Sequence, residues 1–130
     1  MYKMKLLVAT KYVHNGNGIK TAFDGTNETV EQLAGDGSYK SKECEDILNA
    51  SDVVITNPPF SKLSDYIPFV INHNVDVVLI VNMMMLATKR VEPYILSKRF
   101  NDITSHGACH SFTRPDGTIA HNIVAMITTF

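Results

Sequence analysis

The chain has 130 residues, with 12 Lys and Arg against 13 Asp and Glu and a formal net charge of −1. Hydrophobic residues make up 45% of the sequence and charged residues 19%, which argues against an intrinsically disordered chain and indicates one folded domain over residues 1–130. The balanced charge argues against a strong free-standing nucleic-acid-binding domain. The apolar runs are too short for a membrane span or a signal peptide, so we expect a cytoplasmic protein.

The first part of the chain predicts a hairpin. The apolar run at residues 6–13 is typical of a buried strand. Asn15 and Gly16 tolerate positive φ and therefore predict a hairpin turn, because Asn-Gly is a strong signal for such turns. Residues 19–23 are then expected to form the return strand, and residues 24–27 a second turn.

The remaining predicted elements alternate between helices and strands. They are a helix from Ser41, a strand at 53–56, a helix at 65–72, a strand at 75–81, a helix at 88–99 and two strands at 103–105 and 123–128 joined by a turn at 114–117. Asp65 is expected to cap its helix and to place Pro68 in the first turn, where a missing N–H does little harm. The unbroken apolar run at 75–81 fits a strand buried on both faces. We therefore expect an α/β fold with a mostly parallel sheet and helices on both faces.

The motif that carries chemistry is Asn57-Pro58-Pro59-Phe60, at the carboxyl end of a predicted strand. Ligands of parallel sheets bind beyond the carboxyl ends of the strands. Each proline fixes its own φ and pushes the residue before it into an extended conformation, so the loop is stiff and its polar groups are pre-oriented. The alternative is a strand that simply ends in a Pro-rich turn. The aromatic fourth residue and the helix expected after it favour a functional origin.

These four residues are suited to hold a planar amino group. The Asn57 side-chain oxygen and the Pro58 carbonyl oxygen are able to accept two hydrogen bonds from one amino nitrogen and so to orient its lone pair. Phe60 supplies a flat face for an unstacked base, and such stacking stabilises binding by ~1–3 kcal/mol. The chemistry that fits is transfer of a methyl group from a sulfonium donor to the amino nitrogen, which needs positioning more than acid or base catalysis.

Residues 52–61 (DVVITNPPFS) resemble the catalytic segment of amino-group methyltransferases, and the chain is similar to adenine-specific DNA methyltransferases of the EcoRI type. The resemblance covers most of the chain and is strongest from residue 35 to residue 60. It implies S-adenosylmethionine (SAM) as donor and a flipped adenine as acceptor, with Asn57 and Pro58 holding the amino group and Phe60 stacking on the base. It also implies part of a seven-stranded, Rossmann-like methyltransferase sheet.

The resemblance is weaker at the donor site. A family step with an acidic residue that helps to hold the adenine of SAM aligns with Gly37-Ser38-Tyr39, so Ser38 stands where the acid is expected and Asp36 lies near enough to substitute for it. The family's first strand and its cofactor loop are not found, and the strand at 6–13 then lacks a neighbour in the middle of the sheet. Because unpaired backbone is costly, we expect either a rearranged sheet or completion by a second copy or a second chain.

DNA is the expected partner. Three lysines flank the proposed site and are expected to contact phosphates: Lys40, Lys42 and Lys62. The basic pairs at 89–90 and 98–99 fit a solvated helix face better. Four further residues match no standard zinc spacing, so no metal site is predicted: His106, Cys109, His110 and His121.

Two other functions stay open. One is a non-catalytic binding module derived from such a methyltransferase, which the altered donor site favours. The other keeps the chemistry but changes the acceptor to another planar amino group, such as that of adenine in RNA or of a protein glutamine. The sequence does not separate these acceptors.

Overall fold

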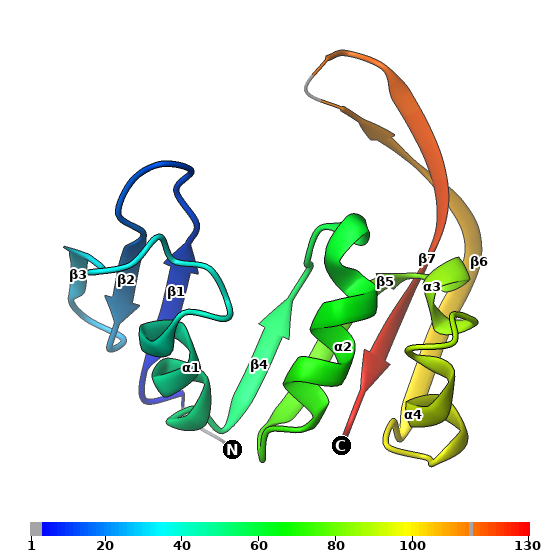
Figure 1. Ribbon diagram of the computed structural model, residues 1–130, viewed down its shortest axis with the longest axis horizontal. Coiled ribbons are helices and arrows are strands. Elements are labelled where there is room, and N and C mark those ends of the chain that lie inside the picture. The colour runs from blue at the N-terminus through cyan, green and yellow to red at the C-terminus, as the bar shows by residue number, and fades with distance from the viewer. Residues whose placement is uncertain (1–3, 115) are drawn as a thin grey trace. The chain divides into compact units, whose positions relative to one another are not determined.

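The computed structural model describes residues 4–114 and 116–130, with side chains at all of these except 105–110, 112 and 122–124. The chain forms two compact units, which we call the first unit (Met1–Ala50) and the second unit (Ser51–Phe130). Figure 1 labels their elements. The expected organisation as one domain stays a prediction, because two compact units can belong to one domain.

The first unit is built on a three-stranded antiparallel sheet. Its strands are β1 (Leu7–Lys11), β2 (Ile19–Phe23) and β3 (Glu28–Gln32), in the order β1-β2-β3. The predicted hairpin is confirmed, and Asn15 in its turn has a φ of 55°. The prediction of a buried, central strand at residues 6–13 is wrong, because β1 is an edge strand of this sheet and Leu7 is 51% exposed.

Helix α1 (Lys42–Asn49) confirms the helix predicted from Ser41. The Ser41 hydroxyl accepts a hydrogen bond from the Cys44 N–H at 3.3 Å and so caps the helix. Cys44 and Leu48 lie one turn apart on the same face, and both are buried. Together with Leu33 they make up the buried hydrophobic residues described in the first unit, so this core is small.

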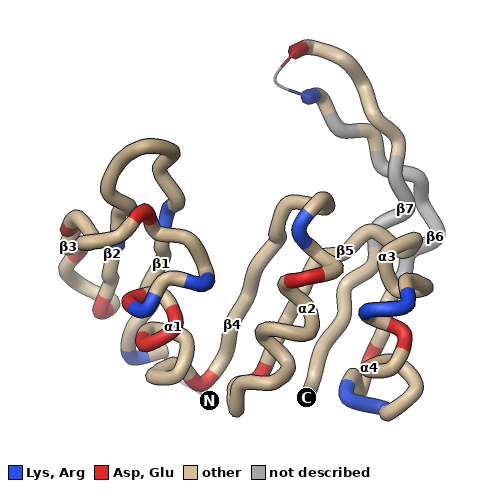
Figure 2. Tube along the Cα trace, viewed as in Figure 1, with Lys and Arg blue, Asp and Glu red and all other residues tan. Residues whose placement is uncertain are grey.

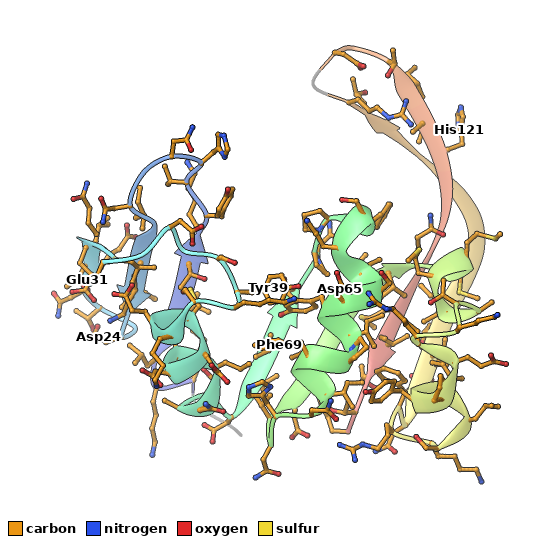
Figure 3. All side chains as sticks on the ribbon, viewed as in Figure 1. Asp24, Glu31, Tyr39, Asp65, Phe69 and His121 are labelled. Atoms are coloured by element: carbon orange, nitrogen blue, oxygen red, sulfur yellow. The ribbon has the colours of Figure 1, made fainter. Side chains whose placement is uncertain are left out.

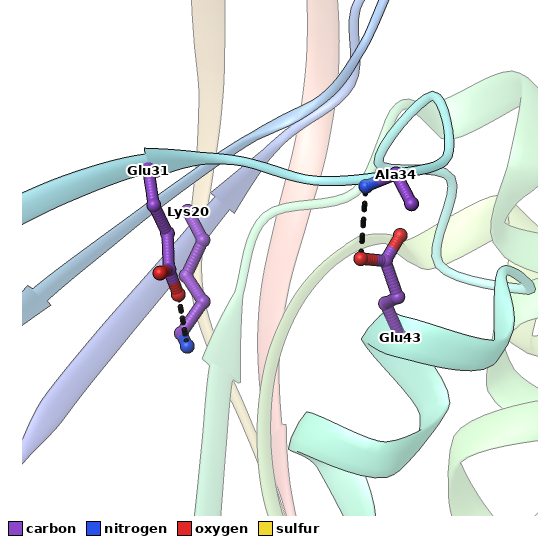
Figure 4. A network of polar contacts seen from close by, with 4 residues as sticks. All are labelled: Lys20, Glu31, Ala34 and Glu43. Carbon is purple, nitrogen blue, oxygen red and sulfur yellow. Dashed lines mark hydrogen bonds and ion pairs between the residues drawn. The ribbon is translucent and has the colours of Figure 1, made fainter.

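Polar contacts supplement that small core (Figure 4). The Glu43 carboxylate of α1 accepts hydrogen bonds from the N–H groups of Ala34 and Gly35 at 2.9 and 2.8 Å. These two bonds, that from Ala34 foremost, favour the charged form and hold the pKa of Glu43 below its usual value. Lys20 of β2 and Glu31 of β3 are register partners and form an ion pair across the sheet.

The second unit contains a four-stranded mixed sheet. Its strands are β4 (Val53–Thr56), β5 (Asp76–Asn82), β6 (Asp102–Thr113) and β7 (Ile119–Thr128), in the order β4-β5-β7-β6. β4 and β5 are parallel, whereas β7 is antiparallel to both β5 and β6. The chain is therefore α/β with mixed sheets. The prediction of mostly parallel pairing is wrong, because β7 returns from β6 through a hairpin and hairpins join antiparallel strands.

The helices of the second unit depart from the predicted bounds. They are η1 (Phe60–Lys62), α2 (Leu63–Ile71), α3 (Met83–Leu86) and α4 (Glu92–Leu96). The helix predicted at 65–72 is confirmed, but it begins two residues earlier and so has Pro68 in its interior. The single helix predicted at 88–99 is wrong. Pro93 fixes the start of α4, and a positive φ of 54° at Lys98 prevents its continuation.

Helix α2 covers one face of the four-stranded sheet, as Figure 1 shows where it crosses in front of β5. The packed side chains are fully buried: Val77, Leu79 and Val81 from β5, and Leu63, Ile67 and Val70 from α2. The opposite face is open, since Ile55 is 78% exposed and Ile80 is 39% exposed. The prediction that residues 75–81 are buried on both faces is therefore wrong.

Candidate functional site

The Asn-Pro-Pro-Phe motif lies in the connection between β4 and η1. β4 ends at Thr56, so Asn57 is the first residue beyond the carboxyl end of the strand, as predicted. Asn57 is exposed, Pro58 is buried and Phe60 is half-buried. Pro59 has φ −55° and ψ 132°, and its carbonyl oxygen accepts a hydrogen bond from the Lys62 N–H at 2.9 Å. The connection is thus extended at Pro59 and closes at once into a helical turn.

Two acceptors in this connection have no hydrogen-bond partner among the residues that the structure describes. Within the described residues, neither the Asn57 side chain nor the Pro58 carbonyl oxygen takes part in a hydrogen bond. The two groups belong to consecutive residues of a proline-stiffened backbone, so little conformational entropy remains to be lost when both bind one ligand. This pair of oxygens is able to accept the two N–H bonds of a planar amino group.

The end of β5 lies at the same edge of the sheet. Thr56 is the register partner of Leu79, which places Asn57 and Pro58 level with the last residues of β5. Asn82 ends this strand, and its side-chain oxygen caps α3 by accepting the Met84 N–H at 2.9 Å. Met84 itself is 78% exposed. The sheet edge beside the motif therefore presents an apolar, flexible side chain as well as polar ones.

Basic groups near the motif differ in how far they are neutralised. Lys62 lies in η1, is exposed and forms no ion pair with the described residues. Arg90, by contrast, pairs with Asp65 in the first turn of α2, a residue labelled in Figure 3. Of these two cations, Lys62 is the one whose charge stays available to a phosphate.

The predicted donor residues lie in the first unit, in the loop before α1. The Asp36 carboxylate accepts the Ser38 N–H at 2.8 Å, which makes a local turn, and the Ser38 carbonyl accepts the Ser41 N–H at 2.8 Å. Within the described residues, the second carboxylate oxygen of Asp36 has no partner. It remains an acceptor for a hydroxyl or amino group of a ligand.

The two lysines of the first unit are both in local contacts. The Lys40 ammonium lies 5.6 Å from the centroid of the Tyr39 ring. Lys42 pairs with Asp46 one turn along α1, and this hydrogen bond raises the pKa of Lys42 above its usual value. Its charge is balanced by a neighbouring carboxylate, which makes Lys42 a weaker phosphate ligand than Lys62. Figure 2 shows charges of both signs interspersed along each unit, in keeping with the net charge of −1.

A separate concavity of about 460 Å³ opens at the other end of the four-stranded sheet. Asp52, just before β4, and Asp76, the first residue of β5, line it together with Arg99. The Arg99 guanidinium donates to the Ile71 carbonyl at the end of α2 at 2.8 Å. Because Asn57 follows the opposite end of β4, this concavity is not part of the motif site.

Metal and membrane signals are weak in the part of the chain that can be described. Its His, Cys, Asp and Glu side chains form no group of three that would hold a metal ion. The side chains of His106, Cys109 and His110 lie outside the described residues, so the expectation of no metal site stays a prediction. The helices in the described ranges lack the length and apolar character of a membrane span.

The comparison with known families decides the family. A family model described as adenine-specific methyltransferase EcoRI matches residues 2–112, which include the whole motif site. The chain belongs to this family. The resemblance found in the sequence is thereby confirmed.

Three curated relatives align with part of the chain. The type II methyltransferase M.EcoRI of Escherichia coli is 37% identical over 78 residues, 60% of this chain and 23% of the relative. M.MpnI of Mycoplasma pneumoniae is 40% identical over 70 residues, 54% of this chain and 22% of the relative. M.MgeORF184P of Mycoplasma genitalium is 35% identical over 72 residues, 55% of this chain and 23% of the relative. The chain thus spans less than a quarter of the length of these relatives. No solved structure matches it.

The sequence of this chain predicts the contiguous motif but not the contacts between residues that are distant in the sequence. The Asp65–Arg90 ion pair joins the first turn of α2 to the segment before α4, 25 positions along the chain. The Glu43 contacts with Ala34 and Gly35 likewise join a helix to the loop before it. Glu43 is the second residue of α1, and an acidic residue in the first turn of a helix predicts contact with backbone N–H groups, but not which segment supplies them.

Proposed function

We propose that this chain is the acceptor-binding part of a SAM-dependent DNA methyltransferase that modifies the amino group of a flipped adenine. The observation that carries the proposal is the pair of adjacent oxygens, on Asn57 and Pro58, that have no partner within the described residues. They stand at the carboxyl end of β4 in a chain that belongs to an adenine-specific methyltransferase family.

The chain's own residues act on the acceptor by positioning it. The Asn57 oxygen and the Pro58 carbonyl oxygen each accept one N–H of the adenine amino group, which turns the nitrogen lone pair away from the ring plane and toward the donor. Phe60 stacks on the base with ~1–3 kcal/mol, which offsets much of the few kcal/mol needed to unstack it from the duplex. Pro59 keeps both acceptors in place by fixing the backbone between the motif and η1.

The donor-binding residues fit one part of SAM. The free carboxylate oxygen of Asp36 and the Ser38 hydroxyl match the amino and hydroxyl groups of a nucleoside. When bound, SAM supplies a methyl group on a sulfonium centre, which is electrophilic without acid catalysis. We propose that Asp36 takes the place of the acidic residue that the family uses near this position.

The four-stranded sheet supports a partial Rossmann-like fold. β4, β5 and β6 run in one direction, and the motif follows the carboxyl end of β4. α2 covers one face, and the other face keeps Ile55 and Ile80 exposed. We propose that further polypeptide, either a second chain or a second copy, completes the donor site.

The test is methyl transfer from labelled SAM to duplex DNA by the full chain and by an Asn57→Ala variant. Loss of one pre-positioned hydrogen-bond partner typically costs ~10²–10³ in rate, so transfer is expected to fall by at least about 100-fold. Asn74→Ala is the matched control, because Asn74 is also an exposed Asn of the second unit and lies in the turn before β5, at the opposite end of the sheet. Full activity of Asn57→Ala would contradict the proposed role of the oxygen pair.

The product identifies the acceptor. Mass spectrometry of digested DNA is expected to show adenine methylated on its amino group. Methylation of RNA or of a glutamine amide in place of DNA would keep the chemistry and refute the acceptor. Absence of transfer to all three, with SAM bound in a calorimetric titration, would favour the non-catalytic binding module.

A further inference from the structure

The last two strands extend well beyond the sheet to which they belong. β7 pairs with β5 over residues 124–128, and the last such pair joins Asn82 to Val124. Residues 109–113 of β6 and 119–123 of β7 pair only with each other, after a register shift between Ser105 and Cys109. We call residues 109–123 the distal ribbon. Figure 1 shows it curving away from the body of the second unit.

The distal ribbon projects from the same end of the sheet as the motif site. β4 and β5 are parallel, and β6 has the same direction because β7 opposes both β5 and β6. β6 therefore extends beyond the sheet at the same end at which β4 stops and Asn57 follows it. β4 and β7 are separated by β5, which places them two strand spacings, or about 10 Å, apart where the ribbon begins.

One face of the distal ribbon is open to solvent. Ser111 pairs with His121, and Thr113 pairs with Ile119, which puts these four residues on one face, and all four are exposed. Figure 3 shows His121 on the ribbon, away from the helices of the second unit. An isolated two-stranded hairpin is at best marginally stable in water. Docking of this exposed face on a partner would therefore stabilise the ribbon.

The tip of the ribbon carries an available guanidinium. The Arg114 N–H and carbonyl close the turn through bonds to Thr118 and Gly117 at 2.8 and 2.9 Å. Its side chain makes one long contact, at 3.3 Å, to the Thr118 hydroxyl, and no ion pair with the described residues. The Asp116 carboxylate is bound by Thr118, first through the hydroxyl and then through the N–H, and these bonds lower the pKa of Asp116. Among the described residues, most of the five Arg114 side-chain donors therefore have no acceptor.

We propose that the distal ribbon enters the major groove of duplex DNA beside the adenine held at Asn57, with Arg114 donating to phosphate or base-edge acceptors there. This inference rests on the proposed function. The major groove is about 12 Å wide and 8.5 Å deep and admits a two-stranded ribbon. Five paired residues beyond the sheet give the ribbon a reach of about 17 Å, enough to span that depth. The exposed hydroxyl, imidazole and guanidinium groups supply the donors that such a groove accepts.

Most of the distal ribbon lies outside the segment that matches the family model. The family model matches residues 2–112, so the tip and all of β7 lie beyond the matched segment. The inference therefore stands on the direction of the strands, the exposed ribbon face of Ser111, Thr113, Ile119 and His121, and the Arg114 guanidinium, which has no ion pair with the described residues. It assigns a surface that the motif site does not include.

The test is fluorescence anisotropy of a labelled duplex of mixed sequence, titrated with the full chain at several salt concentrations. Arg114→Gln is expected to weaken binding about tenfold, and, where the contact is to a phosphate, to reduce the slope of log K against log salt by about 0.9. Thr113→Glu, which places a negative charge on the exposed ribbon face, is expected to weaken binding at least as much. Lys98→Gln is the control, since Lys98 is an exposed cation that precedes the start of β6, at the opposite end of the sheet.

The outcomes separate this inference from the proposed function. If Arg114→Gln and Thr113→Glu bind the duplex normally and the unaltered chain transfers methyl groups, the proposed role of the distal ribbon in DNA binding is refuted and the proposed function stands. Equal losses for Arg114→Gln and Lys98→Gln would also overturn it, because they would show a diffuse charge effect. Asn57→Ala is expected to keep duplex binding and to lose methyl transfer. Full methyl transfer by Asn57→Ala, together with weakened duplex binding by Arg114→Gln, would refute the motif site alone. Absence of duplex binding by the unaltered chain would overturn both.

Discussion

Gly18→Ala tests how the first unit is held together. Gly18 and Gly37 are both buried and lie where the end of the β1–β2 hairpin crosses the loop before α1. A methyl group at Gly18 would lie 2.5 Å from both the Cα and the N of Gly37 and 2.8 Å from the Asp36 carbonyl carbon. All three are backbone atoms, so no side-chain rotation relieves the contact.

The expected loss of stability is comparable to the stability of the unit itself. Overpacking of a well-packed site costs ~1–3 kcal/mol. Separating the two segments also weakens the bond from the Gly18 N–H to the Gly35 carbonyl at 2.8 Å and that from the Val13 N–H to the Asp36 carbonyl at 2.9 Å. At about 1 kcal/mol for each bond, the total reaches about 3–5 kcal/mol. At ~0.05–0.15 kcal/mol per residue, a unit the size of residues 1–50 has only about 2.5–7.5 kcal/mol to lose.

Hydrogen exchange with mass spectrometry measures this effect for each unit separately. In Gly18→Ala, peptides from residues 4–50 are expected to lose most of their protection, while peptides from the second unit are compared as an internal reference. Gly35→Ala is the matched control, because a methyl group there would meet only Glu43 Oε2 at 3.4 Å and Ser41 Cβ at 3.8 Å. Gly25→Ala isolates backbone strain, since its φ is 96° and nothing lies within 4 Å, and ~1–2 kcal/mol is expected. Unchanged protection in Gly18→Ala, or an equal loss in Gly35→Ala, would refute the reasoning.

Two further predictions concern charge. The pKa of Glu43 is lowered in the folded state, so its contribution to stability is complete above the ordinary value of 4.5 and is lost as the pH falls through the folded-state pKa. In the unaltered chain, hydrogen-exchange protection of the Ala34 and Gly35 amides is therefore expected to fall as the pH is lowered, and in Glu43→Gln this pH dependence is expected to be weaker. The same pH dependence in both proteins would contradict the proposed direction of the Glu43 pKa shift. Lys62→Ala is expected to lower the salt slope of duplex binding by about 0.9, and Lys42→Ala by less, because Asp46 already neutralises Lys42. Equal slopes for the two variants in anisotropy titrations would show that the ion pair does not decide which lysine meets phosphate.

Local signals in the sequence were sufficient for several elements. β2 matches its prediction at both ends, because a turn with Asn15 precedes it and a second turn follows it. α1 follows Ser41, whose hydroxyl caps it as Ser does at many helix starts. These signals depend on neighbouring residues only, so no knowledge of the tertiary fold is needed to use them.

Burial was harder to predict because it depends on which face of a strand another element covers. The apolar run of β5 suggests burial on both faces, yet Leu79 is fully buried while Ile80 beside it is 39% exposed. Only packing against α2 distinguishes these two neighbours. The length of β6 and β7 escaped prediction for a related reason. Ser111, Thr113 and His121 lie on an exposed ribbon face and are not apolar, so they give no strand signal based on alternating apolar residues.

The motif site was predictable because its chemistry is contiguous, whereas its support is not. β4 has four residues and is an edge strand of its sheet, so the strand alone is a weak anchor for the loop that follows. The firmer anchor comes from the other side of the loop. Pro58 is buried, and Leu63, at the start of α2, is fully buried against the sheet. The two ends of the motif are thus fixed by apolar packing, while Asn57 between the strand and Pro58 stays exposed. Packing that buries Pro58 and leaves the Asn57 amide accessible is what a loop requires if it is to orient a ligand without first reorganising itself.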